Sequence, residues 1–292
     1  MKTPQPSRVA RMTRELLAWY ADAQRDLPWR HTRDPYRIWV SEVMLQQTTV
    51  KVVIPYYGAF LERFPTVSDL AAAREEDVLA SWSGLGYYAR ARNLRRAAQG
   101  LVERHGGRFP RDVKTAMTLD GVGPYTASAV TSIAYGTRAA AVDGNVKRVL
   151  SRLHAARGLA ETRARDLAQE LLPRTSPGRW NEAMMELGAT ICTPKRPQCD
   201  ACPVAAHCRG RRRATYWSER PSRRPGTRTR VEMALVERRG GILLVRNPAS
   251  GLMAGLFELP HAGLPRDRRA GATLQTRYRD LLRIDPGVVG QV

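Results

Sequence analysis

Apolar residues up to about residue 208 recur with the period of an amphipathic helix. Between Arg14 and Gln24 they fall on one stripe, at Leu16, Leu17, Trp19, Tyr20 and Ala23. The same pattern predicts further helices over 37–47, 69–81, 89–105, 111–118, 124–135, 145–155, 162–172 and 179–192. No long alternation of apolar and polar residues interrupts them, so we predict a mainly α domain.

The helix boundaries carry their own signals. Asp69 is a suitable N-cap for the helix over 69–81, because its carboxylate can accept a hydrogen bond from the first turn. Gly106 and Gly107 follow the helix over 89–105, where a left-handed residue commonly ends a helix. Pro124 suits a first helical position, since its missing N–H is not needed there.

A different composition begins after Cys208. Residues 209–230 contain nine arginines and one acidic residue, a local charge of +8, which predicts a linker that either follows phosphates or is simply solvated. Residues 231–237 and 242–245 then predict a β-hairpin. We therefore predict a helical domain over 1–208, a linker over 209–230 and a small β-containing module over 231–292.

The charge of the chain points to a polyanionic partner. There are 48 Lys plus Arg against 27 Asp plus Glu in 292 residues, a formal net charge of +21, and such an excess favours contact with phosphates. Codon bias is an alternative explanation, because 43 of the 48 basic residues are Arg. No apolar run is long enough for a membrane span and no secretory signal is evident. We expect a cytoplasmic protein.

Four cysteines lie within 17 residues and the rest of the chain has none. Cys192, Cys199, Cys202 and Cys208 have the spacing C-x6-C-x2-C-x5-C. Clustered thiols in a cytosolic chain indicate a metal site more often than disulfides. Four thiolates suit tetrahedral zinc or an iron–sulfur cluster. Zinc ribbons usually have two C-x2-C pairs, and the single pair here favours the cluster.

Two segments resemble a DNA-contacting turn and a catalytic helix start. Residues 119–127 read LDGVGPYTA, in which Gly121, Val122 and Gly123 precede a helix, a geometry that can approach a phosphate closely. About 20 residues later Asp143 stands just before another helix, where it is either an N-cap or a functional carboxylate. The pattern of residues 119–127 resembles the helix-hairpin-helix element of DNA repair proteins.

The order of hairpin, aspartate and cysteine loop resembles base-excision DNA glycosylases. The segments LPWR (27–30), WVSEVMLQQT (39–48), GLGYYARARNL (84–94) and NEAMMELGA (181–189) narrow the resemblance to MutY-type adenine DNA glycosylases. This resemblance implies the helix-hairpin-helix glycosylase fold, one [4Fe–4S] cluster on the four cysteines, and double-stranded DNA containing an adenine mispair as substrate. It also implies a monomer associated with the bacterial nucleoid.

Glu42 is a single carboxylate in a nearly apolar helical stretch, so it is either turned to solvent or functional. Burial would raise its pKa above the ~4.3 of free Glu, which allows it to carry a proton near neutral pH. Departure of adenine needs a general acid, and the resemblance assigns this role to Glu42. Asp143 is then expected to stay ionised and to stabilise an oxocarbenium-like sugar.

The resemblance also assigns residues around these two carboxylates. Bifunctional relatives have a lysine where this chain has Tyr125, and tyrosine forms no Schiff base, so we expect a monofunctional enzyme. Asn145 is expected to orient Asp143. Arg30, Gln47, Thr48 and Tyr87 join Gly121, Val122 and Gly123 as expected DNA-contacting residues. Ordinary half-buried packing is the alternative for Tyr87 and Tyr88, and we assign Trp29, Trp39 and Trp82 to the core.

The resemblance weakens toward the C-terminus. Residues 246–260 resemble the start of a Nudix-like domain that recognises 8-oxoguanine, and we find no match after Pro260. We therefore expect a partial α+β Nudix-like module, and catalysis on adenine is better supported than preference for the 8-oxoguanine mispair. Two other functions stay open: an endonuclease III-like glycosylase/lyase on oxidised pyrimidines, and a non-catalytic DNA-binding scaffold.

Overall fold

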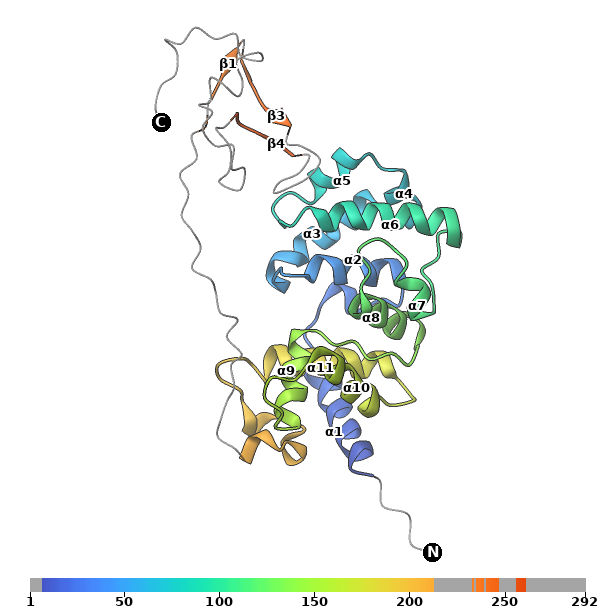
Figure 1. The fold of residues 1–292 in the computed structure, drawn as a ribbon, viewed down its shortest axis with the longest axis vertical. Helices are drawn as coiled ribbons and strands as arrows, with labels where there is room; N and C mark the ends of the chain where they lie inside the picture. The colour runs from blue at the N-terminus through green and yellow to red at the C-terminus, as the bar shows by residue number, and fades with distance from the viewer. Residues whose placement is uncertain (1–6, 213–232, 234, 239, 247–255, 261–292) are drawn as a thin grey trace, which may run out of the picture. The chain divides into compact units, whose positions relative to one another are not determined.

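A computed structural model describes residues 7–212, 233, 235–238, 240–246 and 256–260 (Figure 1). Its helices are α1 (Arg8–Ala23), α2 (Pro35–Leu45), α3 (Val50–Arg63), α4 (Val67–Ala72), α5 (Glu75–Ser81), α6 (Ala89–His105), α7 (Val113–Ala116), α8 (Pro124–Tyr135), α9 (Gly144–Leu153), α10 (Glu161–Leu171) and α11 (Pro177–Thr190). Short 3-10 turns occupy Pro28–Arg30, Cys199–Ala201, Ala205–His207 and Gly210–Arg212. The expectation of a mainly α fold is confirmed.

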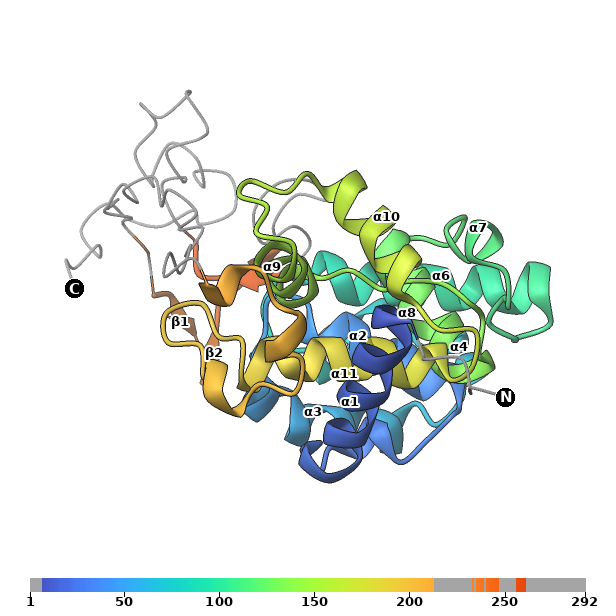
Figure 2. The same cartoon turned by 90° about the horizontal axis from the view of Figure 1, so that it is seen from below.

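The helices form two groups. Helices α2 to α8 make one group, in which α2 packs on α8 and α6 packs on α4 and α5. The other group contains α9, α10 and α11, and the N-terminal helix α1 packs with them (Figure 2). Helix α11 packs on both α8 and α9, so it joins the two groups. Side chains at this junction are therefore contributed by both groups.

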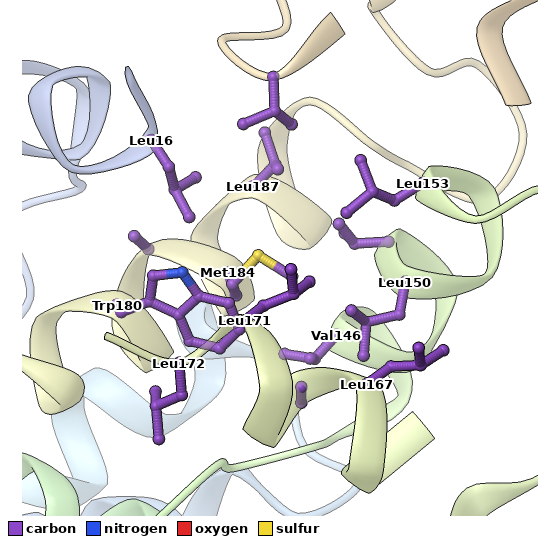
Figure 3. Close-up of a cluster of buried hydrophobic side chains, with 14 of the residues drawn as sticks. Leu16, Val146, Leu150, Leu153, Leu167, Leu171, Leu172, Trp180, Met184 and Leu187 are labelled. Atoms are coloured by element: carbon purple, nitrogen blue, oxygen red, sulfur yellow. The ribbon is translucent and has the colours of Figure 1, made fainter. Parts of the chain in front are cut away.

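The second group has a continuous apolar core. Trp180 and Leu187 of α11 meet Leu16 of α1 and Leu150 of α9, and all four are fully buried (Figure 3). Burial of side chains of this size contributes roughly 1.5–3 kcal/mol each, which accounts for the packing of helices that are far apart in sequence. Three of the four cysteines pack against the same core: Cys192, Cys202 and Cys208.

Several predicted boundaries are confirmed. The helices over 89–105 and 124–135 have the predicted ends, and Gly106 ends the first of them with φ of +58°. Trp29, Trp39 and Trp82 are buried as expected. Most other predicted helices appear with ends shifted by one or two residues, which leaves only the four-residue α7 of the segment 111–118, after its N-cap Asp112. The largest shift is at α1, which begins at Arg8 rather than at residue 14.

Two predictions along the first group are wrong. The segment 69–81 is not one helix but α4 and α5, because Ala73 and Arg74 are extended and three acidic residues at 75–77 favour a new helix start. Asp69 is not the N-cap: Thr66 is, and Asp69 completes a capping box as its third helical residue. Helix α3 was not predicted, and it contains an internal proline, Pro55.

The C-terminal region contains two short antiparallel pairs in its described part. Strand β1 (Glu237–Arg238) pairs with β2 (Gly241–Ile242), and β3 (Val245–Arg246) pairs with β4 (Phe257–Glu258). The predicted hairpin pairing is present next to its turn, where Glu237 lies opposite Ile242. Val245, expected in the same hairpin, pairs instead with Glu258 of β4. In the predicted strand 231–237, the described residues 235 and 236 are not in a strand. Most of the Arg-rich linker lies outside the described residues. The chain divides into compact units Met1–Glu219 and Arg220–Val292. The Nudix-like character of residues 231–292 stays a prediction.

Within the described part of the chain, no helix combines the length and the apolar character that a membrane span requires.

Candidate active site

One large cavity opens where the two helix groups meet. It has a volume of about 1060 Å³ and is lined from α2, α8, α9 and α11. The four residues expected to be catalytic all line it: Glu42, Tyr125, Asp143 and Asn145. Three of the residues expected to contact DNA also line it, namely Arg30, Gln47 and Thr48. Tyr87 and the hairpin residues 121–123 lie outside this lining.

Glu42 is a buried member of the cavity lining. It belongs to α2 and is only 6% exposed, so its side chain is turned into the protein and not to solvent. The hydroxyl of Tyr125 donates a hydrogen bond to Glu42 Oε2 over 2.6 Å. Burial raises the pKa of Glu42 to about 7, with the charges of Asp143 and Glu182 adding to the rise and the Tyr125 bond opposing it. A carboxyl group with this pKa can carry a proton at neutral pH.

Asp143 is an N-cap that also lines the cavity. It is the N-cap of α9, where its Oδ1 accepts a hydrogen bond from Val146 N at 2.7 Å. Its other oxygen, Oδ2, accepts from Asn145 Nδ2 at 2.8 Å. The carboxylate thus lines the cavity while two donors fix its orientation.

Tyr125 is placed to remain a hydrogen-bond donor. Burial and the neighbouring carboxylates raise the pKa of Tyr125 well above its usual value, so the phenol keeps its proton. Its hydroxyl also lies 3.1 Å from the Sδ of Met185. Lys147 of α9 is another member of the cavity lining, and its amine is relevant to any lyase activity.

Sequence reasoning missed a second buried carboxylate, Glu186. Arg25 donates to both of its oxygens at 2.8 Å, and Arg30 Nη2 donates to its Oε2 at 2.6 Å. Although burial raises the pKa of Glu186, the hydrogen bonds from Arg25 and Arg30 lower it to about 2. Glu186 lies in an apolar helical stretch, the same signal that pointed to Glu42. The cavity therefore holds two carboxyl groups whose pKa values are driven apart.

Two residues expected at the DNA have left-handed backbone conformations. Gln47 follows the end of α2 with φ of +58°, and Tyr87 precedes α6 with φ of +49°. This region is unfavourable for side chains other than glycine, and such residues often mark functional sites. The Tyr87 side chain is 63% exposed, so the packing alternative is wrong for this residue, whereas Tyr88 is half-buried.

The hairpin between α7 and α8 has the predicted glycine geometry. Gly121 has φ of +71°, and a Cβ atom there would lie 2.7 Å from the Cβ of Asn93. Gly123 is the N-cap of α8, and Pro124 is its first residue. Both glycines are exposed and Val122 is buried, so the turn is anchored by one side chain while its backbone faces solvent.

The cysteine loop follows α11 and has a donor set suited to a cluster. All four thiols are free and half-buried, and burial together with the other three cysteines raises the pKa of Cys202 to about 11. A cation among the thiols would relieve this repulsion. Within the described residues, no three His, Cys, Asp or Glu are grouped as a site for a single ion. Four free thiols in one loop are a donor set that an iron–sulfur cluster accepts.

Two arginines of α9 connect the cysteine loop to the cavity. Arg152 Nη1 lies 3.3 Å from Cys192 Sγ and donates to the Thr193 carbonyl at 2.7 Å. Arg148 donates to the Cys192 carbonyl at 2.9 Å and to Asn145 Oδ1 at 2.8 Å. The loop and the Asp143–Asn145 pair are thus fixed by the same helix. Sequence reasoning had no signal for this, because arginines on a helix are usually solvated.

Two family matches cover the helical region. Residues 40–174 match the family described as HhH-GPD superfamily base excision DNA repair protein. Residues 192–208 match the iron–sulfur binding domain of endonuclease III. The expectation of an iron–sulfur cofactor is confirmed by this second match.

Several curated relatives are adenine DNA glycosylases. The rat protein is 39% identical over 88% of this chain and 61% of its own length, and the human protein is 40% identical over 84% and 56%. The Mycolicibacterium smegmatis protein is 47% identical over 68% of both chains. The chain spans about 56–61% of the length of the rat and human relatives.

Solved structures agree on the fold. A thermostable thymine-DNA glycosylase aligns with a TM-score of 0.65 and 32% identity over 69% of this chain and 95% of its own. A trapped endonuclease III–DNA covalent intermediate aligns with a TM-score of 0.62 and 28% identity over 73% and 99%. The chain therefore belongs to the HhH-GPD superfamily of base excision DNA repair proteins, and within it to the adenine DNA glycosylase family.

Proposed function

We propose that this protein is an adenine DNA glycosylase that hydrolyses the N-glycosidic bond of adenine mispaired with 8-oxoguanine or guanine. One observation carries the proposal: a buried glutamate with a pKa of about 7, Glu42, shares a cavity with an oriented aspartate, Asp143. An acid beside a fixed carboxylate is what N-glycoside cleavage requires.

In the proposed reaction the two carboxyl groups have opposite roles. Protonated Glu42 donates its proton to the departing adenine, whose anion would be a poor leaving group. Ionised Asp143 stabilises the positive charge that develops on the sugar as the bond breaks. Asn145 and the amide of Val146 hold Asp143 in place for this purpose. Water then attacks the sugar, and the product is an intact abasic site.

Tyr125 supports a monofunctional reaction. A phenol cannot form the Schiff base through which an amine nucleophile leads to strand cleavage. Lys147 in the cavity lining is the residue that a lyase activity would use instead. Borohydride trapping distinguishes the two: we expect no substantial covalent complex with the unmodified protein, and a trapped complex lost in Lys147→Ala would assign lyase activity to that amine.

Double-stranded DNA is the proposed partner. The hairpin glycines 121 and 123 present exposed backbone to a phosphate, and the left-handed Gln47 and Tyr87 are suited to enter the duplex as adenine leaves the stack. The similar endonuclease III structures are complexes with DNA. We further propose a monomer that acts at the bacterial nucleoid.

The four cysteines Cys192, Cys199, Cys202 and Cys208 are the proposed ligands of one [4Fe–4S] cluster. When bound, the cluster ties the loop into one rigid piece, and base release itself needs acid catalysis rather than electron transfer. Packing of three of these cysteines on the α9–α11 core supports this structural role. Brown colour and absorbance near ~400 nm would distinguish a cluster from zinc.

The test is adenine release from duplexes containing A:8-oxoguanine, A:G and A:T. We expect release from the two mispairs, and Glu42→Gln or Asp143→Asn should abolish it while duplex binding is kept. Asp34→Asn is the matched control for the second variant, because Asp34 is also an N-cap but lies at α2.

The outcomes separate the competing functions. No release from any mispair by the unmodified protein would support a DNA-binding scaffold. Release of oxidised pyrimidines in place of adenine would support the endonuclease III-like alternative.

A further inference from the structure

Arg90, the second residue of α6, is a buried arginine in the described chain that contacts five oxygen atoms. It is 9% exposed. Its Nη1 donates to the carbonyl oxygens of Val43 and Met44 at 2.8 and 2.9 Å. Its Nη2 donates to the carbonyls of Leu85 and Gly86 at 3.1 and 3.0 Å, and to Thr48 Oγ1 at 3.2 Å.

These oxygens belong to the two segments that carry the left-handed residues. Val43 and Met44 are at the C-terminal end of α2, and Thr48 directly follows Gln47. Leu85 and Gly86 directly precede Tyr87. The guanidinium therefore joins the turn of Gln47 to the turn of Tyr87. Because α2 also carries Glu42, the same group sets both turns relative to the proposed acid.

Charge pairing does not explain the burial of Arg90. No Asp or Glu among the described residues forms an ion pair with it. Its guanidinium instead lies 5.3 Å from the Trp82 ring centroid and 5.6 Å from that of Tyr87. Burying a cation without a carboxylate is costly, and here backbone carbonyls and two aromatic rings offset that cost. The arrangement fixes the distance and orientation between the turn of Gln47 and the turn of Tyr87.

The geometry needs a guanidinium in particular. Its two terminal nitrogens project in a planar fork, so one binds the α2 end while the other binds the 85–86 turn. A lysine ammonium is a single point with three donors and cannot reach both segments in the same way. Arg90→Lys therefore keeps the charge and removes the connection.

We infer that Arg90 is a positioning residue that fixes the spacing between Gln47 and Tyr87 and thereby controls extrusion of the target base. This inference rests on the proposed function, in which both residues enter the duplex. The expected defect lies in unstacking the base, before the bond is broken. Single-turnover release from an A:G duplex should fall about 10- to 100-fold in Arg90→Lys, the scale expected when catalytic geometry is displaced by about an ångström.

Two readouts separate positioning from general loss of structure. The first is the fluorescence of 2-aminopurine at the target position, which rises on unstacking. It is measured in a Glu42→Gln background so that the base is not released, and adding Arg90→Lys should remove most of the rise. The second is release of adenine from a position where it is already unpaired. There the cost of extrusion is smaller, and Arg90→Lys should be much less impaired than at A:G.

Arg95→Lys is the matched control. Arg95 is on the same helix and half-buried, but its Nε donates to the Ala73 carbonyl at 2.6 Å, on the connection between α4 and α5. We expect wild-type release and fluorescence from it. Circular dichroism and absorbance near ~400 nm confirm folding and cluster content of every variant. If Arg90→Lys does not fold, Thr48→Val removes one of the five contacts and should give a smaller defect of the same kind.

The outcomes are distinct. A folded Arg90→Lys with an unchanged rate and fluorescence rise would overturn the inference. A folded variant equally impaired at paired and unpaired adenine would also overturn it, since extrusion would then not be the affected step. A wild-type protein that releases no adenine would refute the proposed function instead.

Discussion

The hydrogen bond from Tyr125 to Glu42 is predicted to set the pH above which base release declines. Release requires the protonated acid, so the rate should fall as pH rises through the Glu42 pKa of about 7. With that pKa, about nine tenths of the molecules carry the proton at pH 6 and about one tenth at pH 8. The single-turnover rate should therefore drop roughly tenfold between these values.

Tyr125→Phe removes a bond that stabilises the ionised form of Glu42. A hydrogen bond to a charged group is worth about 1.5–3 kcal/mol, and 1.36 kcal/mol corresponds to one pKa unit, so the Glu42 pKa should rise by ~1–2 units. The pKa rises because the carboxylate loses a hydrogen-bond donor, which favours the protonated form. The alkaline limb of the rate profile should thus move to higher pH, toward about 8–9.

The assay is single-turnover adenine release between pH 5.5 and 9.5 at constant ionic strength. Tyr135→Phe is the control, because its hydroxyl is on the same helix but donates to the Phe109 carbonyl at 2.7 Å. It should keep the wild-type profile. An alkaline limb that stays in place in Tyr125→Phe, or moves to lower pH, would refute the assignment of this limb to Glu42.

Three other predictions concern stability and positioning. Glu186→Gln should lower the free energy of unfolding at pH 7 by ~3 kcal/mol, measured by urea denaturation, because Arg25 and Arg30 lose their buried partner; a change below ~0.5 kcal/mol would contradict this. Gly188→Ala places a Cβ 2.6 Å from that of Asn145, so release should slow at least about tenfold, whereas Gly58→Ala, with open space around it, should leave the rate unchanged. Cys202→Ser should lose the ~400 nm absorbance, and full retention of the chromophore would exclude this thiol as a ligand.

The pKa shifts of Glu186 and Glu42 also make the free energy of unfolding depend on pH. The folded-state pKa of Glu186, about 2, lies below its ordinary value, so its stabilising contribution is present above about pH 4.5 and lost as pH falls toward 2. Glu42 acts in the opposite direction. Its pKa is raised, so ionising it costs folding free energy, and the cost appears as pH rises from about 4.5 to 7.

Sequence reasoning predicted the elements whose signals are local. The ends of α6 and α8 depend on Gly106 and Pro124, whose backbone preferences hold in any surroundings. Glu42 stood out as a single carboxylate in an apolar stretch. Asp143 occupies an ordinary N-cap position, so only the family resemblance assigned it a role. By contrast, α3 was missed, and the break between α4 and α5 depends on two extended residues in the middle of a periodic pattern.

The parts that were missed depend on long-range contacts. Glu186 pairs with arginines more than 150 residues away, and a helical periodicity cannot show such a partner. In the sequence Arg90 resembles any solvent-exposed arginine on a helix. In the structure the end of α2 and residues 85–86 surround its guanidinium. The four residues expected to be catalytic line one cavity, whereas Tyr87 and residues 121–123 lie outside it. The contacts of Arg90 and Arg148 with these segments were visible only in the structure.

The return of α1 to the α9–α11 group has a consequence for synthesis. Helices α2 to α8 leave the ribosome before the helices that pack on α1 have been synthesised. The first group can therefore form from nearby contacts while residues 8–23 are still unpacked. The core around Leu16 and Trp180 can close only once α11 has emerged. The N-terminal helix is thus among the first segments synthesised and the last to pack. A premature stop before residue 177 would leave its apolar stripe exposed.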